Sequence, residues 1–102
     1  MNEAELERGV RDLLKVYRLH GFHAHDSRKS AGPGFPDWTI CGTGGLIFRE
    51  LKSETGQLSP EQRRWRNVLV AAGQDWAVWR PEDLRTGRIV RELQAVARAG
   101  QR

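Results

Sequence analysis

Two short apolar segments joined by a glycine-rich tetrapeptide constrain this chain more than any other feature. Residues 37–41 and 46–52 each have the composition of a β-strand, and the glycines between them are typical of a tight turn. Strands joined in this way form a hairpin, which brings Asp37 and Glu50 to the same end of a sheet. Side chains alternate faces along a strand, so Glu50 and Lys52 are expected on one face.

The segments on either side of this hairpin predict further helices and strands. Apolar residues recur at helical spacing near both ends of the chain, and Ser59-Pro60 is typical of a helix start. We therefore expect one α/β domain of residues 1–102, with a small mixed sheet flanked by helices in the order α-β-β-β-α-β-α. The predicted helices are 2–20 (stopped by Gly21), 59–73 and 88–99, the strands are 22–25, 37–41, 46–52 and 75–80, and a short helical turn follows at 81–84.

Composition excludes several kinds of site. Cys41 is the only cysteine, so an internal disulfide and a cysteine-based zinc site are both excluded. The first residues are acidic and polar and no apolar run could span a bilayer, so we expect a cytoplasmic protein without a membrane partner. The net charge is +4, and the excess lies after residue 58, where nine Arg accompany five Asp or Glu. This favours a polyanionic partner; a merely solvated basic surface is the alternative.

Asp37, Glu50 and Lys52 have the chemistry of a metal-dependent hydrolytic site. Pro36 restrains the backbone from which Asp37 enters its strand. Two carboxylates on rigid strands supply the oxygen ligands that Mg²⁺ or Mn²⁺ prefers. Such a metal polarises a phosphoryl oxygen and activates a water, while Lys52 can stabilise the developing anion. The alternative is an ordinary Glu-Lys pair on a surface strand and an unrelated Asp in a turn.

Residues outside the hairpin could add to this site. Helix phase turns Glu3 toward the body of the protein, so it is a candidate site residue; stabilisation of the positive helix end is the alternative. His23 and His25 share a strand face and are interpreted as half-buried polar residues, with His25 the nearer to the site. Gln62 can close a capping box and also leans toward the sheet.

The helix over residues 59–73 is expected to pack inward through one apolar face and to expose its arginines. The inward residues are Trp65, Val68, Leu69 and Ala72. The four tryptophans of the chain are interpreted as core or interface anchors, with base stacking as the alternative. The candidate DNA-binding residues, which solvation alone could also explain, are Arg28, Lys29, Arg63 and Arg64.

Three motifs together resemble the PD-(D/E)xK nuclease superfamily and, more narrowly, the stand-alone VRR-NUC (virus-type replication-repair nuclease) domain. They are Gly34-Phe35-Pro36-Asp37, Phe48-Arg49-Glu50-Leu51-Lys52 and Gly56-Gln57-Leu58-Ser59-Pro60-Glu61-Gln62. The likeness covers nearly the whole chain. It implies a restriction-endonuclease-like core and a bacterial or phage DNA endonuclease that acts as a homodimer on branched DNA such as Holliday junctions.

The resemblance also implies roles for individual residues. Asp37, Glu50 and the Leu51 carbonyl would ligate Mg²⁺ or Mn²⁺, and Lys52 would act on the attacking water or the anionic transition state. The site residues expected to assist through bound waters are Glu3 and Gln62. Two alternatives stay open: a non-catalytic, structure-specific DNA-binding subunit, which would not require this trio, and an RNA-directed nuclease.

A two-fold homodimer is also expected from the apolar content of so small a domain. Four tryptophans, three phenylalanines and a tyrosine must be accommodated, so some apolar surface is predicted at an interface between copies. Arg49 lies among apolar neighbours on its strand, and we expect it at a sheet edge or dimer surface rather than in a closed core. Such a dimer would present two sites to two strands.

Overall fold

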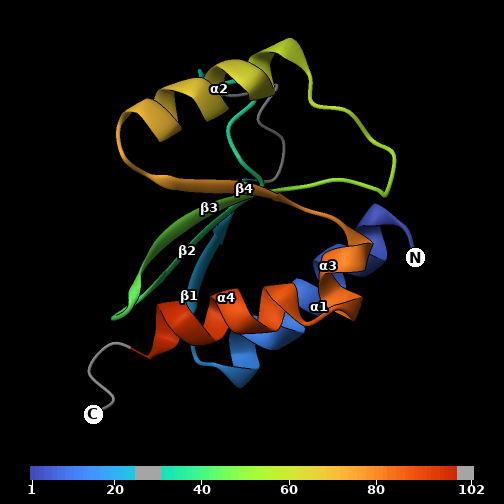
Figure 1. The fold of residues 1–102 in the computed structure, drawn as a ribbon, viewed down its shortest axis with the longest axis vertical. Coiled ribbons are helices and arrows are strands. Elements are labelled where there is room, and N and C mark those ends of the chain that lie inside the picture. Colours follow the sequence, from blue (N-terminus) through green and yellow to red (C-terminus); the bar gives the residue numbers. More distant parts are fainter. Residues whose placement is uncertain (25–30, 99–102) are drawn as a thin grey trace.

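A four-stranded mixed sheet separates two layers of helices in the computed structural model, which describes residues 1–24 and 31–98 (Figure 1). The strand order is β1-β2-β3-β4, with β1 to β3 antiparallel and β4 parallel to β3. The predicted α/β class and mixed sheet are thus confirmed. The helices are α1 (Glu3–Val16), α2 (Pro60–Ala71), α3 (Pro81–Arg85) and α4 (Arg88–Ala97), and the strands are β1 (His20–His23), β2 (Trp38–Gly42), β3 (Gly45–Leu51) and β4 (Asp75–Trp79).

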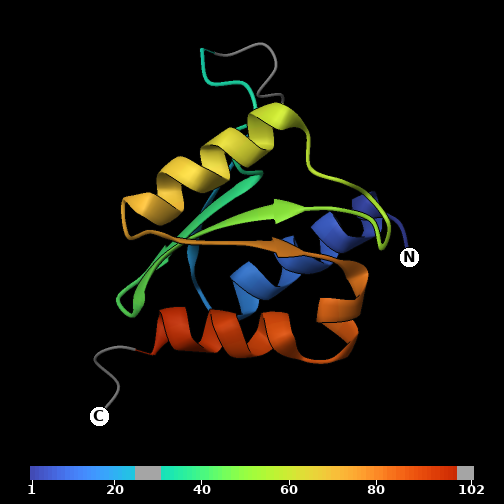
Figure 2. The same cartoon turned by 45° about the horizontal axis from the view of Figure 1, so that its top comes forward.

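The helices divide unequally between the two faces of the sheet. Helices α1, α3 and α4 lie together on one face and α2 lies alone on the other, as Figure 2 shows from a second direction. The larger core is on the side of α1 and α4. It comprises Leu6, Val10, Leu14, Trp38, Ile40, Ile47, Leu51, Trp79, Ile89, Leu93 and Val96. Trp38 and Trp79 are therefore core anchors, as predicted. No helix in the described part of the chain is long and apolar enough to cross a membrane.

Helix α1 ends earlier than its apolar spacing predicts. Its start is fixed by a capping box between Asn2 and Glu5, with both side chain-to-backbone bonds under 3 Å. The helix ends at Val16, and Arg18 takes the left-handed conformation with φ of 55°. The prediction that Gly21 stops the helix is wrong, because Gly21 already lies within β1. A non-glycine residue made the reversal, and no local sequence signal marks it.

Helix α2 packs on the sheet through a small second apolar layer. Phe35 lies edge-on to Phe48 and to Trp65, with ring centroids 6.0 and 5.0 Å apart, and Leu69 is buried. Val68 is 62% exposed, so its predicted inward position is wrong. Consecutive helical residues are 100° apart, and a face centred between Trp65 and Leu69 leaves Val68 turned outward.

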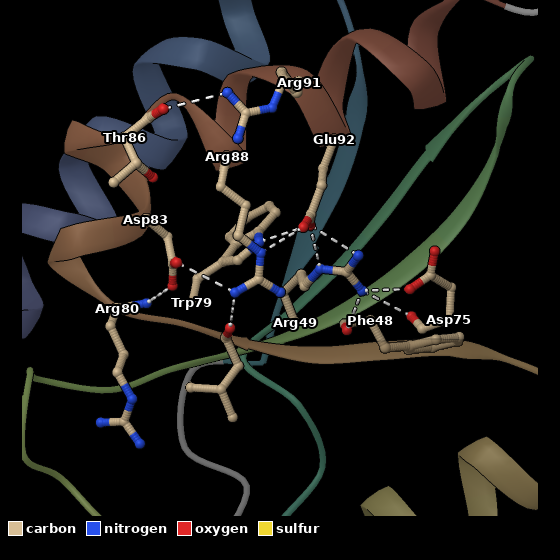
Figure 3. Close-up of polar contacts among 11 residues, drawn as sticks. Phe48, Arg49, Asp75, Trp79, Arg80, Asp83, Thr86, Arg88, Arg91 and Glu92 are labelled. Carbon is tan, nitrogen blue, oxygen red and sulfur yellow. Dashed lines mark hydrogen bonds and ion pairs between the residues drawn. The ribbon is translucent and has the colours of Figure 1, made fainter.

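Arg49 is buried, which contradicts its predicted place at a sheet edge or dimer surface. It is 3% exposed on the face of β3 that α4 covers. Its guanidinium forms ion pairs with Glu92 on α4 at 2.9 Å and with Asp75 on β4 at 3.0 Å, and it lies over the Trp79 ring (Figure 3). Paired in this way, a guanidinium can remain charged in a closed core.

Candidate active site

The hairpin places Asp37 and Glu50 beside each other at one end of the sheet. Trp38 pairs with Arg49 across the ladder, so the residues one step further along, Asp37 and Glu50, face each other. The Asp37 Oδ2 atom accepts a 2.7 Å hydrogen bond from the Leu51 backbone N–H. This bond continues the β2–β3 ladder through a side chain and fixes the Asp37 carboxylate against the end of β3.

Glu50 is held by the first turn of α2. Its side chain is buried, and its Oε2 atom accepts a 2.9 Å hydrogen bond from the Gln62 Nε2 group. The other end of the same amide caps the helix, since Gln62 Oε1 accepts from the Ser59 backbone N–H at 2.9 Å. Gln62 therefore closes the capping box of α2 and also contacts Glu50, the two roles that the sequence suggests.

The pKa of Glu50 is raised to about 9, mainly by burial and further by the negative charge of Asp37 and a side-chain hydrogen bond with Asp37. Lys52 acts in the opposite direction but is outweighed. Charged carboxylates placed in this way repel each other, and the repulsion favours a cation beside them. A divalent ion bound by both carboxylates would relieve this repulsion, so the pair is a candidate cation site.

Glu3 joins this group from α1. Partial burial raises its pKa, the charge of Asp37 raises it further, and that of Lys52 opposes the change. A cavity of about 270 Å³ opens between α1 and the strand ends; it is lined by Glu3, Ala4, Glu7, His23, Asp37 and Leu51. The charges of Glu3, Asp37 and Lys52 all act on Glu50, so the structure brings these four residues into one electrostatic neighbourhood.

The donor atoms fit a hard divalent cation that keeps several waters. Residues 1–24 and 31–98 contain no group of three or more His, Cys, Asp or Glu placed to hold a metal. Two carboxylates remain, from Asp37 and Glu50, with the backbone of Leu51 beside them. The Leu51 N–H is directed to Asp37, and in a strand the N–H and C=O of one residue point to the same side, so its carbonyl can be a third ligand. Mg²⁺ is commonly bound by one or two carboxylates and water.

Two of the four candidate DNA-binding residues, Arg63 and Arg64, follow Gln62 on α2. Arg63 and Arg64 are exposed on α2; Arg63 donates to the Leu58 carbonyl at 2.8 Å, and Arg64 pairs with Glu61 at 3.5 Å. Arg28, Lys29 and His25 lie outside the described residues.

Sequence reasoning missed two further residues near the site. His23 lines the cavity, forms a 3.1 Å pair with Glu7 and lies 4.9 Å from the Trp38 ring. Its position follows from the β1–β2 register, which pairs His23 with Trp38 and which the sequence does not reveal. Arg80 donates to the carbonyls of Ser53 and Gly56 at 2.6 and 2.9 Å and so secures the segment that follows Lys52.

We expect the protein without divalent cations to lose stability as pH rises from about 5 to about 9. The folded-state pKa of Glu50 is about 9 against an ordinary value of 4.5, so in this window the folded state binds more protons than the unfolded state. The free energy of unfolding then falls with rising pH. Thermal unfolding in EDTA across this range measures it. Glu50→Gln should flatten the slope, and parallel curves for the two proteins would contradict the assignment.

These placements rest on the geometry and chemistry of the chain itself. No protein-family model matches the chain, and comparison with curated proteins and with solved structures found no match.

Proposed function

We propose that this protein is a metal-dependent DNA endonuclease with a restriction-endonuclease-like core of the VRR-NUC type. The observation that carries the proposal is the adjoining pair Asp37 and Glu50, which the β2–β3 register places opposite each other, with Lys52 two residues beyond Glu50. Binding alone would not require two carboxylates held this close with a lysine beside them, whereas phosphodiester hydrolysis uses all three.

The residues of the chain divide the chemistry among them. Asp37, Glu50 and the Leu51 carbonyl would hold Mg²⁺ or Mn²⁺, which on binding would polarise the scissile phosphoryl group and acidify a water. Lys52 would orient that water and stabilise negative charge on the phosphoryl oxygens. The Gln62 amide keeps the Glu50 carboxylate in place. Glu3, on the far side of the cavity, can accept a proton through water.

The proposed substrate is branched DNA such as a Holliday junction. The test is incubation of the purified protein with a labelled four-way junction, duplex, single strand and RNA, each in Mg²⁺, Mn²⁺ or EDTA. We expect incision of the junction in either metal and none in EDTA. Tight junction binding without incision in either metal would instead identify a non-catalytic DNA-binding subunit, and preferential cleavage of RNA would identify a ribonuclease.

Binding should depend steeply on salt even when cleavage is prevented. Ca²⁺ in place of Mg²⁺ is expected to preserve binding, because phosphate contacts by arginine do not require hydrolysis. Affinity should fall by roughly 10²-fold between low and moderate salt as counterions are released. Fluorescence anisotropy over a salt series measures the slope, which Arg63→Gln/Arg64→Gln should reduce by about two, one for each lost contact. Arg91→Gln on α4 is the control. An affinity for DNA that does not change with salt would show that the arginines after residue 58 do not form the binding surface.

We also propose a two-fold homodimer, with an interface that uses the free edge of the sheet. Phe22 on the edge strand β1 is 66% exposed, and exposed apolar edges favour pairing with another chain. Light scattering should give twice the chain mass of 11.6 kDa, and Phe22→Glu should return the protein to that value. Val70→Glu is the control, since Val70 is 55% exposed on α2 and is not part of the sheet edge. A wild-type mass near 11.6 kDa would exclude the dimer.

A further inference from the structure

A small apolar groove runs along the outer flank of α2. It has a volume of about 230 Å³ and is lined by Pro33, Glu61, Arg64, Trp65 and Val68. Its aromatic wall is held in place from behind, because Phe35 packs edge-on against the Trp65 ring at 89°. Gly32 lies so close that an added Cβ would be 3.2 Å from that ring. The groove thus offers a fixed aromatic surface beside an exposed valine.

The helix that forms this groove has a net positive charge. Helix α2 carries three arginines and one glutamate, and Arg64 and Glu61 at the groove form a loose 3.5 Å pair with both side chains largely exposed. An aromatic surface bordered by the Arg64 guanidinium suits a planar ring on a polyanionic chain. The volume is below the usual range for drug-sized ligands and suits a single ring system.

The groove and the candidate active site share the first turn of α2. Glu61 lines the groove, and the next residue, Gln62, donates to Glu50. Gly34 passes directly against Glu61, where an added Cβ would be 2.5 Å from the Glu61 carbonyl carbon, and the same segment leads into Asp37. One turn of α2 thus borders both places, as would be required if a strand with a phosphate at Glu50 had a neighbouring nucleotide at Trp65.

We propose that this groove binds an unpaired nucleobase of the strand whose phosphate lies at Asp37 and Glu50. The inference rests on the proposed function and names the part of the substrate that is recognised. A base can stack on Trp65 only when it has left its own duplex partner, so the groove favours single-stranded segments and branch points over intact duplex.

The test compares a labelled thymidine single strand with an abasic strand of equal length and charge, by fluorescence anisotropy in Ca²⁺. We expect the wild-type protein to bind the base-bearing strand about tenfold more tightly. Trp65→Leu and Val68→Gln should remove most of this difference while leaving affinity for the abasic strand unchanged. Val68 is exposed, so its replacement should not affect folding, and Val70→Gln, an exposed valine of the same helix outside the groove, is the matched control.

Three results would overturn the inference. The first is that the wild-type protein binds the two strands equally tightly. The second is that both groove variants still distinguish the base-bearing strand from the abasic one. The third is that Val68→Gln converts a dimer to a monomer, which would make the groove an interface between copies. The proposed nuclease activity fails separately, by absence of cleavage in Mg²⁺ and Mn²⁺. If the protein cleaves DNA but does not distinguish the two strands, only the base-binding role of the groove is excluded. If it distinguishes the strands but does not cleave, only the nuclease activity is excluded.

Discussion

Lys52→Ala is expected to reduce phosphodiester cleavage by at least about 10²-fold while leaving DNA binding and the fold intact. The loss matches that caused by removing one transition-state donor from an enzyme site. Lys52 is half-buried, and its positive charge acts on both Glu3 and Glu50. Cleavage rates at saturating Mg²⁺, with binding measured in Ca²⁺, separate the two effects. Lys15→Ala, in the exposed last turn of α1, is the matched control.

Asp37→Ala is expected to abolish cleavage for a related reason, loss of a metal ligand. It also removes the acceptor for the Leu51 N–H, which should cost about 1 kcal/mol of stability and leave the protein folded. Circular dichroism checks the fold in parallel with the cleavage assay. A folded Asp37→Ala protein that cuts at the normal rate in Mg²⁺ would refute the metal assignment.

Glu92→Ala is expected to cause a large loss of stability. The Glu92 carboxylate accepts from Arg49 at 2.9 Å, from Trp79 Nε1 at 2.8 Å and from Arg88 at 2.7 Å (Figure 3). Burial alone would raise the pKa of Glu92. Hydrogen bonds and positive charges, led by the hydrogen bond from Trp79 and the charge of Arg49, outweigh this effect and lower the pKa below its ordinary value. Truncation leaves a buried guanidinium without its main partner, which costs about 3 kcal/mol and lowers Tm by roughly 15 °C.

Two variants test whether the unpaired Arg49 guanidinium causes the stability loss of Glu92→Ala. Glu82→Ala removes a carboxylate from an exposed pair with Arg85 and should leave Tm nearly unchanged. Arg49→Met combined with Glu92→Leu should recover part of the stability lost in Glu92→Ala, because neither charge is then left alone in the core. Thermal unfolding of the four proteins at one pH gives the comparison. A Glu92→Ala protein that unfolds at the wild-type temperature would show that Arg49 finds another partner.

The features that sequence could predict are those fixed by nearby residues. The β2–β3 hairpin follows from two apolar segments and their glycines, and it alone brings Asp37 to Glu50. The start of α2 follows from Ser59, Pro60 and Gln62, because capping needs only one helical turn. Once both are in place, the contact between Gln62 and Glu50 needs no long-range information beyond the packing of α2 on the hairpin.

The features that sequence could not predict depend on distant partners. Arg49 appeared unsuited to a core because its main partner, Glu92, is 43 positions away on α4. Val68 has the spacing of an inward residue, yet the rotation of α2 is set by Trp65 against Phe35, which is a tertiary contact. His23 approaches the site through the register of β1, and register depends on the whole sheet.

The shared core of α1 and α4 has a consequence for how the chain acquires its structure during synthesis. Leu6 and Val10 are completely buried together with Ile89 and Leu93, residues about eighty positions later. The ribosome releases α1 long before α4, so the apolar stripe of α1 remains incompletely covered until α4 has been synthesised. The unit from β3 through α2 to β4 is contiguous and can form earlier, which would place Glu50 and Gln62 together before the molecule has a closed interior.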